Sequence, residues 1–185
     1  MSKTALIILH EGFEEMEAIG PIDILRRGGV EVTVASRECY ATVKGRNQIS
    51  VKADVLLDEA LRQSFDCLIL PGGPGVFEKL RTDRRVLELA EKYAAKGKLV
   101  TAICAAPLVL HDAGVLEGKR FTSHPSTVDE LPGRDTAKAV VEDGNFITSQ
   151  GAGTATAFGL AVLARLTDDA TAREVAKSIC LSSAQ

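Results

Sequence analysis

Short apolar runs that alternate with amphipathic segments of helical length constrain the fold of this chain more than any other feature of its sequence. The runs of strand length stand at residues 5–9, 30–35, 67–70 and 99–103. Segments with helical periodicity stand between several of them, at residues 14–27 and 84–95. Strands that are apolar along their length are typical of a parallel sheet with helices on both faces. We therefore predict an α/β fold with a doubly wound, mostly parallel sheet in a flavodoxin-like sandwich.

Turn residues and weaker patterns extend this prediction over the rest of the chain. Gly28-Gly29 ends the first helix, and Pro21 within it predicts a kink or a break. Gly45-Arg46-Asn47 predicts a turn or hairpin inside residues 40–55. Asp143-Gly144 is a hairpin signal between two of the further strands expected at residues 121–123, 139–142 and 146–149. Further helices are expected at residues 105–113, 155–166 and 170–179.

Composition excludes several classes of protein. A chain of 185 residues with 45% hydrophobic side chains suits one core, so we predict a single domain over residues 1–185. The net charge of -3 leaves no basic surplus for nucleic acid. No segment approaches the roughly 20 apolar residues of a membrane span, and the start does not resemble a signal peptide. The four cysteines have no C-x-x-C spacing, which favours a reduced, cytoplasmic setting.

Cys104 lies at the junction between a predicted buried strand and the helix that follows it. Open α/β sheets bind ligands at the carboxyl ends of their strands, so this junction is a favoured position for function. Because the N–H groups and the dipole at a helix start favour a thiolate, we expect the pKa of Cys104 to be lowered. Ala105 and Ala106 suit the sharp turn of a nucleophile elbow. A structural role is the alternative for this segment alone, because cysteine is also common in apolar cores.

Two more segments follow predicted strands at the same edge of the sheet. Pro71-Gly72-Gly73 is a turn whose glycines can aim backbone N–H groups at an anion, as an oxyanion beside a thiolate requires. An ordinary tight turn is the alternative. The acidic segment at residues 14–17 follows the first strand, and its glutamates can complement the helix dipole, a role that suits Glu14 or Glu15 better than Glu17.

Six ordered motifs together resemble one known family. They are Glu14-Glu15-Met16-Glu17, Arg26-Arg27-Gly28-Gly29, Leu70-Pro71-Gly72-Gly73, the segment at 102–107 around Cys104, Thr122-Ser123-His124-Pro125, and the segment at 148–154. The chain resembles the ThiJ/PfpI superfamily, in the branch that contains the Parkinsonism-associated protein deglycase, with a class I glutamine amidotransferase-like fold. The resemblance covers nearly the whole chain in order and without large gaps.

The resemblance implies roles for individual residues. Cys104 would be the nucleophile, and Glu17 would be a protonated carboxyl that hydrogen-bonds its sulfur. The backbone N–H groups of Gly73 and Ala105 would be the oxyanion donors. Glu17 has to be neutral for this role, because a carboxylate beside a thiolate raises both pKa values. The two groups are therefore expected to titrate as a coupled pair.

Other polar residues have weaker links to the site. His124 matches a histidine close to the reactive cysteine in this branch, where it would shuttle a proton or contact substrate. Arg27 and Arg46 match arginines near the dimer contact and the pocket, where they can attract an anion, and solvated surface charges are the alternative. His10 and His111 have no comparable support, so we expect no metal site and no cofactor.

The function implied by the resemblance is a cysteine-dependent, cofactor-free enzyme. Its substrates would be α-oxoaldehydes such as methylglyoxal and glyoxal, or their protein adducts, so that it would act as a glyoxalase or deglycase. A redox-sensing protein with chaperone activity, acting through oxidation of Cys104, is one alternative. The resemblance also implies a symmetric homodimer with residues 15–27 at the contact.

Two positions depart from the family pattern. An intracellular cysteine peptidase is disfavoured, because such members carry a histidine next to the cysteine and this chain has Ala105. Ala106 stands where close relatives often have glycine. No residue supports an amidotransferase-like or thiazole-pathway role.

Overall fold

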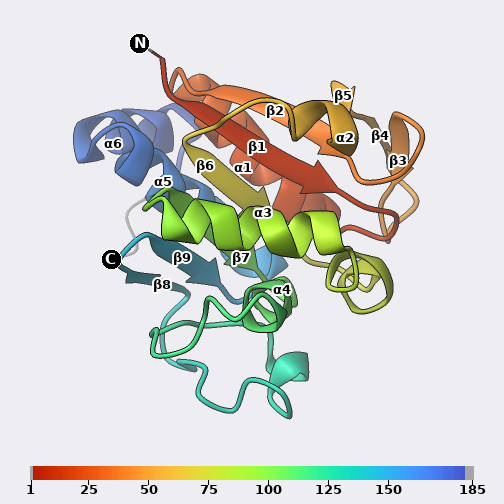
Figure 1. The fold of residues 1–185 in the computed structure, drawn as a ribbon. Helices are drawn as coiled ribbons and strands as arrows, with labels where there is room; N and C mark the ends of the chain where they lie inside the picture. The colour runs from red at the N-terminus through yellow and green to blue at the C-terminus, as the bar shows by residue number, and fades with distance from the viewer. Residues whose placement is uncertain (1, 182–185) are drawn as a thin grey trace.

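A seven-stranded sheet forms the centre of the molecule (Figure 1). The computed structural model describes residues 2–181. In spatial order the strands are β5 (Val55–Leu56), β2 (Glu31–Ser36), β1 (Thr4–Leu9), β6 (Cys67–Leu70), β7 (Leu99–Ile103), β9 (Phe146–Ser149) and β8 (Val140–Asp143). Neighbouring strands are parallel except β8 and β9, which form the predicted hairpin. The predicted α/β fold with a mostly parallel sheet is confirmed.

The central strand β1 shows why its sequence is apolar at every position. Ile7 and Leu9 pack into the core on one face of the sheet, and Leu6 and Ile8 pack into the core on the other. All four side chains are completely buried. A strand covered on both faces has no position where a polar side chain would reach water.

Helices cover both faces of this sheet. On one face lie α1 (Glu15–Arg27), α5 (Ala155–Leu166) and α6 (Asp169–Ser178). On the other lie α2 (Leu57–Ala60), the π-helical turn η1 (Val76–Leu80), α3 (Arg84–Ala95) and α4 (Pro107–Asp112). Figure 1 shows α3 in front of the sheet and α1 behind it. Two layers of helices therefore enclose the strands and leave the sheet's carboxyl edge for the loops.

A small antiparallel hairpin lies outside the main sheet, as the glycine turn predicted. It consists of β3 (Thr42–Lys44) and β4 (Ser50–Lys52). The Glu15 carboxylate accepts hydrogen bonds from the backbone N–H of Asn47 at 2.7 Å and from its side-chain amide at 3.0 Å. A Cβ atom on Gly45 would lie 2.4 Å from Oε1 of Glu15, so a side chain here would displace the Glu15 carboxylate from these contacts. These contacts hold the hairpin turn against the first turn of α1.

Two predictions about the helices differ from the structure in detail. Helix α1 continues through Pro21, so the break predicted there as an alternative to a kink does not occur, and Gly159 of α5 packs closely against this part of the helix. Helix α4 begins at Pro107 rather than at residue 105, because residues 104–106 form the turn. Met16 and Ile19 of α1 are exposed apolar side chains.

Residues 121–123 do not form the expected strand. The N–H of Thr122 donates to the hydroxyl of Thr148, and the hydroxyl of Thr122 donates to the carbonyl of Asp135. The edge of β9 is already taken by β8, so the segment has no strand to pair with. The Thr148 side chain and the backbone N–H of Asp135 satisfy its backbone instead, and a pattern of apolar residues does not predict such partners.

Within residues 2–181, no helix is both long enough and apolar enough to cross a membrane.

Candidate active site

The loops after the parallel strands β1, β6, β7 and β9 meet at the carboxyl edge of the sheet. The loop after β1 bonds to the turn after β6 through the N–H of Glu14 and the carbonyl of Gly72, at 3.0 Å. The N–H of Cys104, just after β7, donates to the carbonyl of Ser149 at the end of β9, at 2.9 Å. The N–H of His124 in turn donates to the carbonyl of Cys104 at 2.8 Å. These backbone bonds bring the sequence motifs together around one thiol.

Cys104 has a left-handed backbone conformation, with φ of 65°. Few residues other than glycine adopt this conformation, and it stores strain of about 1 kcal/mol or more. Ala105 and Ala106 after it are buried, and α4 starts at Pro107. The side chain of Cys104 is partly exposed, and its sulfur accepts hydrogen bonds from the backbone N–H groups of Gly73 and Ala105. This strand-turn-helix geometry is the predicted nucleophile elbow.

Glu17 on the first turns of α1 is almost completely buried beside this thiol. Its side chain hydrogen-bonds with that of Cys104, and its Oε2 accepts a hydrogen bond from the N–H of Gly72 at 3.0 Å. Burial, together with the nearby charge of Glu14, raises the pKa of Glu17 to about 7, although Gly72 and Arg46 act in the opposite direction. A protonated carboxyl is therefore available here near neutral pH.

The thiol pKa departs from the sequence-based expectation. Burial and the negative charge of an ionised Glu17 raise the pKa of Cys104 to about 12, against the lowering effect of the Gly73 and Ala105 N–H groups. Helix α4 has only six residues, and its dipole does not offset these effects. The repulsion disappears when Glu17 carries the proton, because a carboxylic acid donates to the sulfur. The two groups compete for one proton, and its location decides whether the sulfur is reactive.

The two glycines after Pro71 fit the site so tightly that no side chain would be accommodated. A Cβ on Gly72 would lie 2.6 Å from both the Cβ of Cys104 and Oε2 of Glu17. Gly73 has φ of 106°, and a Cβ there would lie 2.3 Å from the carbonyl oxygen of Gly12. The sequence analysis did not predict that the backbone N–H of Gly72 donates to the Glu17 carboxyl. The position of Gly72 next to the predicted donor Gly73 is the feature of the sequence that could have indicated it.

His124 begins the short helical turn η2 (Pro125–Thr127) beside the elbow. Its Nδ1 accepts from the N–H of Ser126 at 3.2 Å and lies 2.8 Å from the Ser126 hydroxyl oxygen. The neutral ring therefore carries its proton on Nε2 and presents a donor there. A Cβ on Gly151 would lie 3.5 Å from Cδ2 of His124 and 3.8 Å from Oε1 of Glu17. His124 thus lies at the site, as a hydrogen-bond donor on its free nitrogen.

The two arginines occupy different places. Arg46 lies in the hairpin turn, where its charge acts on Glu17, and its N–H donates to the carbonyl of Phe13 at 2.8 Å. Arg27 is at the other end of α1, about 15 Å along the axis from Glu17, and forms an exposed ion pair with Asp23 at 2.8 Å. Arg46 belongs to the site, whereas Arg27 does not reach it.

The remaining histidines and cysteines are scattered. Among residues 2–181, no group of three or more His, Cys, Asp or Glu side chains is arranged to hold a metal ion. Cys67 is completely buried, and burial raises its pKa far above the ordinary value. Cys39 and Cys180 are exposed. Cys67 is therefore a core side chain, and Cys39 and Cys180 are accessible from the surface.

Comparisons with known proteins support what the geometry indicates. Residues 3–165 match the DJ-1/PfpI family. The chain is 40% identical to protein dj-1beta of Drosophila melanogaster, over 98% of this chain and 99% of that protein. The crystal structure of Drosophila melanogaster DJ-1beta matches this fold with a TM-score of 0.95, over 99% of this chain and 100% of the other. It is 38% identical to a protein of Pyrococcus abyssi named as a deglycase, over 78% of this chain and 88% of the other. A structure of oxidised DJ-1 from Toxoplasma gondii is 31% identical, with a TM-score of 0.93 over 98% of this chain and 100% of the other. This chain belongs to the DJ-1/PfpI family.

Proposed function

We propose that this chain is a cysteine-dependent, cofactor-free enzyme that acts on α-oxoaldehydes such as methylglyoxal and glyoxal, or on their protein adducts. The observation that carries the proposal is the buried Glu17 carboxyl in contact with the Cys104 thiol, opposite the N–H groups of Gly73 and Ala105. The relative from Pyrococcus abyssi named as a deglycase supports this class of substrate.

The proposed reaction begins when the Cys104 thiolate attacks the aldehyde carbon of methylglyoxal. A carbon–sulfur bond forms, and the carbonyl electron pair moves to oxygen, which accepts hydrogen bonds from the N–H groups of Gly73 and Ala105. Glu17 gives its proton to this oxygen, which completes a hemithioacetal and leaves a carboxylate. Two residues far apart in sequence thus supply the nucleophile and the proton.

The remaining steps move two protons and add one water. The Glu17 carboxylate removes the proton from the carbon bonded to sulfur, which gives an enediolate, and returns it to the neighbouring carbon. In the same rearrangement the hydroxyl proton of the hemithioacetal moves to the oxygen of the neighbouring carbon. The product is a lactoyl thioester, and water cleaves its carbon–sulfur bond to release lactate and the thiol. Methylglyoxal and water together have the atoms of lactic acid, so no oxidant is consumed. Release of lactate from methylglyoxal by the purified chain is the test of the proposal.

Protein adducts enter the same scheme at the aldehyde carbon. A hemithioacetal on a cysteine or a hemiaminal on an amine releases the free aldehyde, or transfers the carbon to Cys104. Comparing lactate release from free methylglyoxal with release from a preformed thiol adduct distinguishes the two activities. Direct action on the adduct gives a rate higher than the adduct's own dissociation allows.

Oxidation of Cys104 is a second candidate function, favoured by the N–H donors around its sulfur. Mild peroxide is expected to add two oxygens to Cys104, because Gly73 and Ala105 can hold the resulting sulfinate. Cys39 and Cys180 are exposed and serve as internal controls that remain unmodified. Mass spectrometry of tryptic peptides measures all three sites in one sample, and equal oxidation of the three would exclude a sensor role.

A peptidase has less support than the enzyme acting on α-oxoaldehydes or the redox sensor. Ala105 follows the nucleophile, and His124 presents a donor rather than a free base on Nε2. Location in the cytoplasm stays a prediction.

A homodimer is also part of the proposal. Met16, Ile19 and Ile49 are exposed by 59%, 40% and 56%, and Glu15 accepts a hydrogen bond from the N–H of Ile49, so α1 and the hairpin turn present apolar groups side by side. Because a charge cannot be buried unpaired in an apolar contact, Met16→Glu is expected to convert a dimer to a monomer in sedimentation velocity. Leu181→Glu, an exposed apolar position elsewhere, is the control that stays dimeric. An unchanged mass for Met16→Glu would place the contact on another surface.

A further inference from the structure

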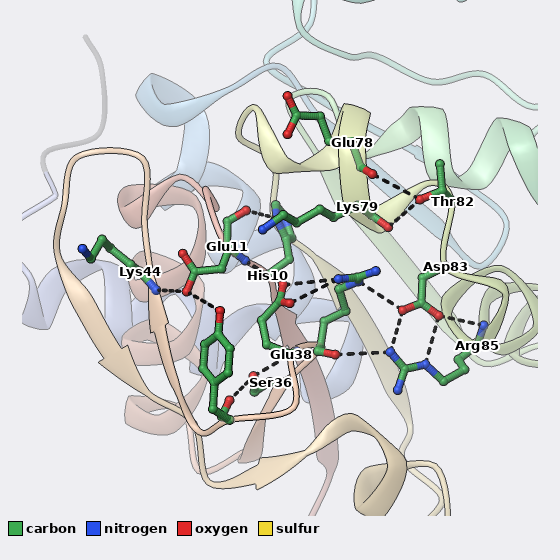
Figure 2. A network of polar contacts seen from close by, with 12 residues as sticks. His10, Glu11, Ser36, Glu38, Lys44, Glu78, Lys79, Thr82, Asp83 and Arg85 are labelled. Atoms are coloured by element: carbon green, nitrogen blue, oxygen red, sulfur yellow. Dashed lines mark hydrogen bonds and ion pairs between the residues drawn. The ribbon is translucent and has the colours of Figure 1, made fainter.

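His10 is a completely buried histidine for which the proposed reaction has no use. It follows β1 directly and lies within a polar network that links the loops after β1 and β2 to the region following η1 (Figure 2). Burial lowers the pKa of His10 to about 4, so the ring is neutral at physiological pH. A buried polar ring needs hydrogen-bond partners, and their identity indicates its role.

Both ring nitrogens of His10 face backbone carbonyl groups. Nδ1 lies 3.2 Å from the oxygen of Glu11, and Nε2 lies 3.5 Å from the oxygen of Pro71. A neutral ring has one N–H, so it can donate to only one of them. The contact with Pro71 is buried, whereas the contact with Glu11 is only partly buried. Because a fully buried carbonyl without a donor costs more free energy than a partly buried one, we place the proton on Nε2.

The Pro71 carbonyl and the Gly72 N–H belong to the same peptide unit. In a trans peptide the C=O and N–H point in opposite directions from one rigid plane. His10 lies on the carbonyl side, and Oε2 of Glu17 accepts from the N–H on the other side at 3.0 Å. A group that holds the carbonyl therefore also sets the direction of the N–H that orients Glu17.

We propose that His10 is a positioning residue, which donates from Nε2 to the Pro71 carbonyl and thereby fixes the peptide whose N–H holds Glu17 against Cys104. The inference rests on the Glu17 and Cys104 pair of the proposed function, and it does not depend on the identity of the substrate. Close packing supports it, since a Cβ on Gly75 would lie 2.5 Å from Nδ1 of His10. The Gly75 backbone therefore packs closely against the ring.

Charged groups act on both ends of this connection. Glu38 and Arg37 face His10, with opposite effects on its pKa, and Figure 2 shows Glu38 next to His10. The charges of Glu14 and Arg46 likewise have opposite effects on the pKa of Glu17. A substitution that keeps the charge of His10 at zero leaves these groups unchanged, so its effect on the thiol reports on the hydrogen bond.

Three neutral variants separate the hydrogen bond from simple packing. Glutamine can place its amide nitrogen where Nε2 stands, asparagine can place one only near Nδ1, and leucine fills the space without a donor. The rate of Cys104 alkylation by iodoacetamide is measured against pH, in protein whose other thiols are identified by mass spectrometry. We expect the midpoint to rise by about half a pH unit in His10→Leu and His10→Asn, which slows alkylation about threefold below the midpoint. In His10→Gln it is expected to stay at the wild-type value.

The wild-type protein provides an independent measurement. Nitrogen-15 NMR of the histidine ring is expected to show the proton of His10 on Nε2, and a proton on Nδ1 would overturn the proposal even if no variant folds. Equal midpoints in all three variants and the wild type would also overturn it, as would an equal shift in all three. Because alkylation needs no substrate, a protein that shows the shift but forms no lactate contradicts the proposed function and leaves the role of His10 standing.

Discussion

Lactate formation from methylglyoxal is expected to fall by at least about 1,000-fold in Cys104→Ala, because the reaction has no other nucleophile. The oxyanion donors Gly73 and Ala105 remain in place, so weak residual binding of the aldehyde is retained. Cys104→Ser is expected to be almost as inactive, since a hydroxyl is not ionised near neutral pH. Enzymatic measurement of lactate over a range of methylglyoxal concentrations provides kcat and KM.

Controls for Cys104→Ala are available in the same chain. Cys39→Ala removes an exposed thiol away from the elbow and is expected to keep full activity. Alanine has the same difficulty as cysteine with a φ of 65°, so the melting temperature of Cys104→Ala should stay close to that of the wild type. Substantial lactate formation by a folded Cys104→Ala protein would show that the thiol is not the nucleophile.

Turnover is expected to fall by about 100-fold or more in Glu17→Gln, because the amide cannot give up or accept the proton. The same amide can still donate a hydrogen bond to the sulfur and carries no negative charge, so Cys104 alkylation should be at least as fast as in the wild type. Glu17→Ala removes both the proton and the hydrogen bond, and it should lose turnover and be alkylated more slowly than Glu17→Gln. Measuring lactate release and alkylation on each variant separates proton transfer from stabilisation of the thiolate.

The stability of the protein should depend on pH through the same residue. The folded-state pKa of Glu17 is about 7, above its ordinary value of 4.5, so the folded state binds the proton more tightly than the unfolded state. The contribution of Glu17 to the free energy of unfolding is at its maximum below about pH 4.5, and it is lost as the pH rises through 7. The difference amounts to at most about 3 kcal/mol. Glu17→Gln should therefore melt at a higher temperature than the wild type at pH 8, with little difference at pH 4.5.

A matched control is Glu91→Gln on the exposed surface of α3, which also removes one carboxylate. It should change neither turnover nor the dependence of the melting temperature on pH. If Glu17→Gln kept wild-type turnover, the proposed proton transfers would have to pass through another group, with His124 as the nearest candidate.

Local patterns were sufficient for most of the fold. Strands β6 and β7 and helices α3 and α5 have the residue bounds that their apolar periodicity predicts, because each is long enough or buried enough to be determined by its own residues. The strand predicted at residues 121–123 does not form, because the backbone of this segment bonds to the Thr148 side chain and to Asp135 rather than to a neighbouring strand. The helix continues through Pro21, where α5 packs closely against α1 at Gly159.

The sequence by itself determined the architecture and the position of Cys104 on a turn, since both follow from the spacing of apolar and small residues. Only the tertiary structure decided the chemistry of that thiol. Burial sets the pKa of Glu17, a carboxylate in contact with the sulfur opposes its ionisation, and a peptide held between His10 and Glu17 orients the pair. Desolvation and contacts between distant residues exist only after folding, so no local pattern contains them.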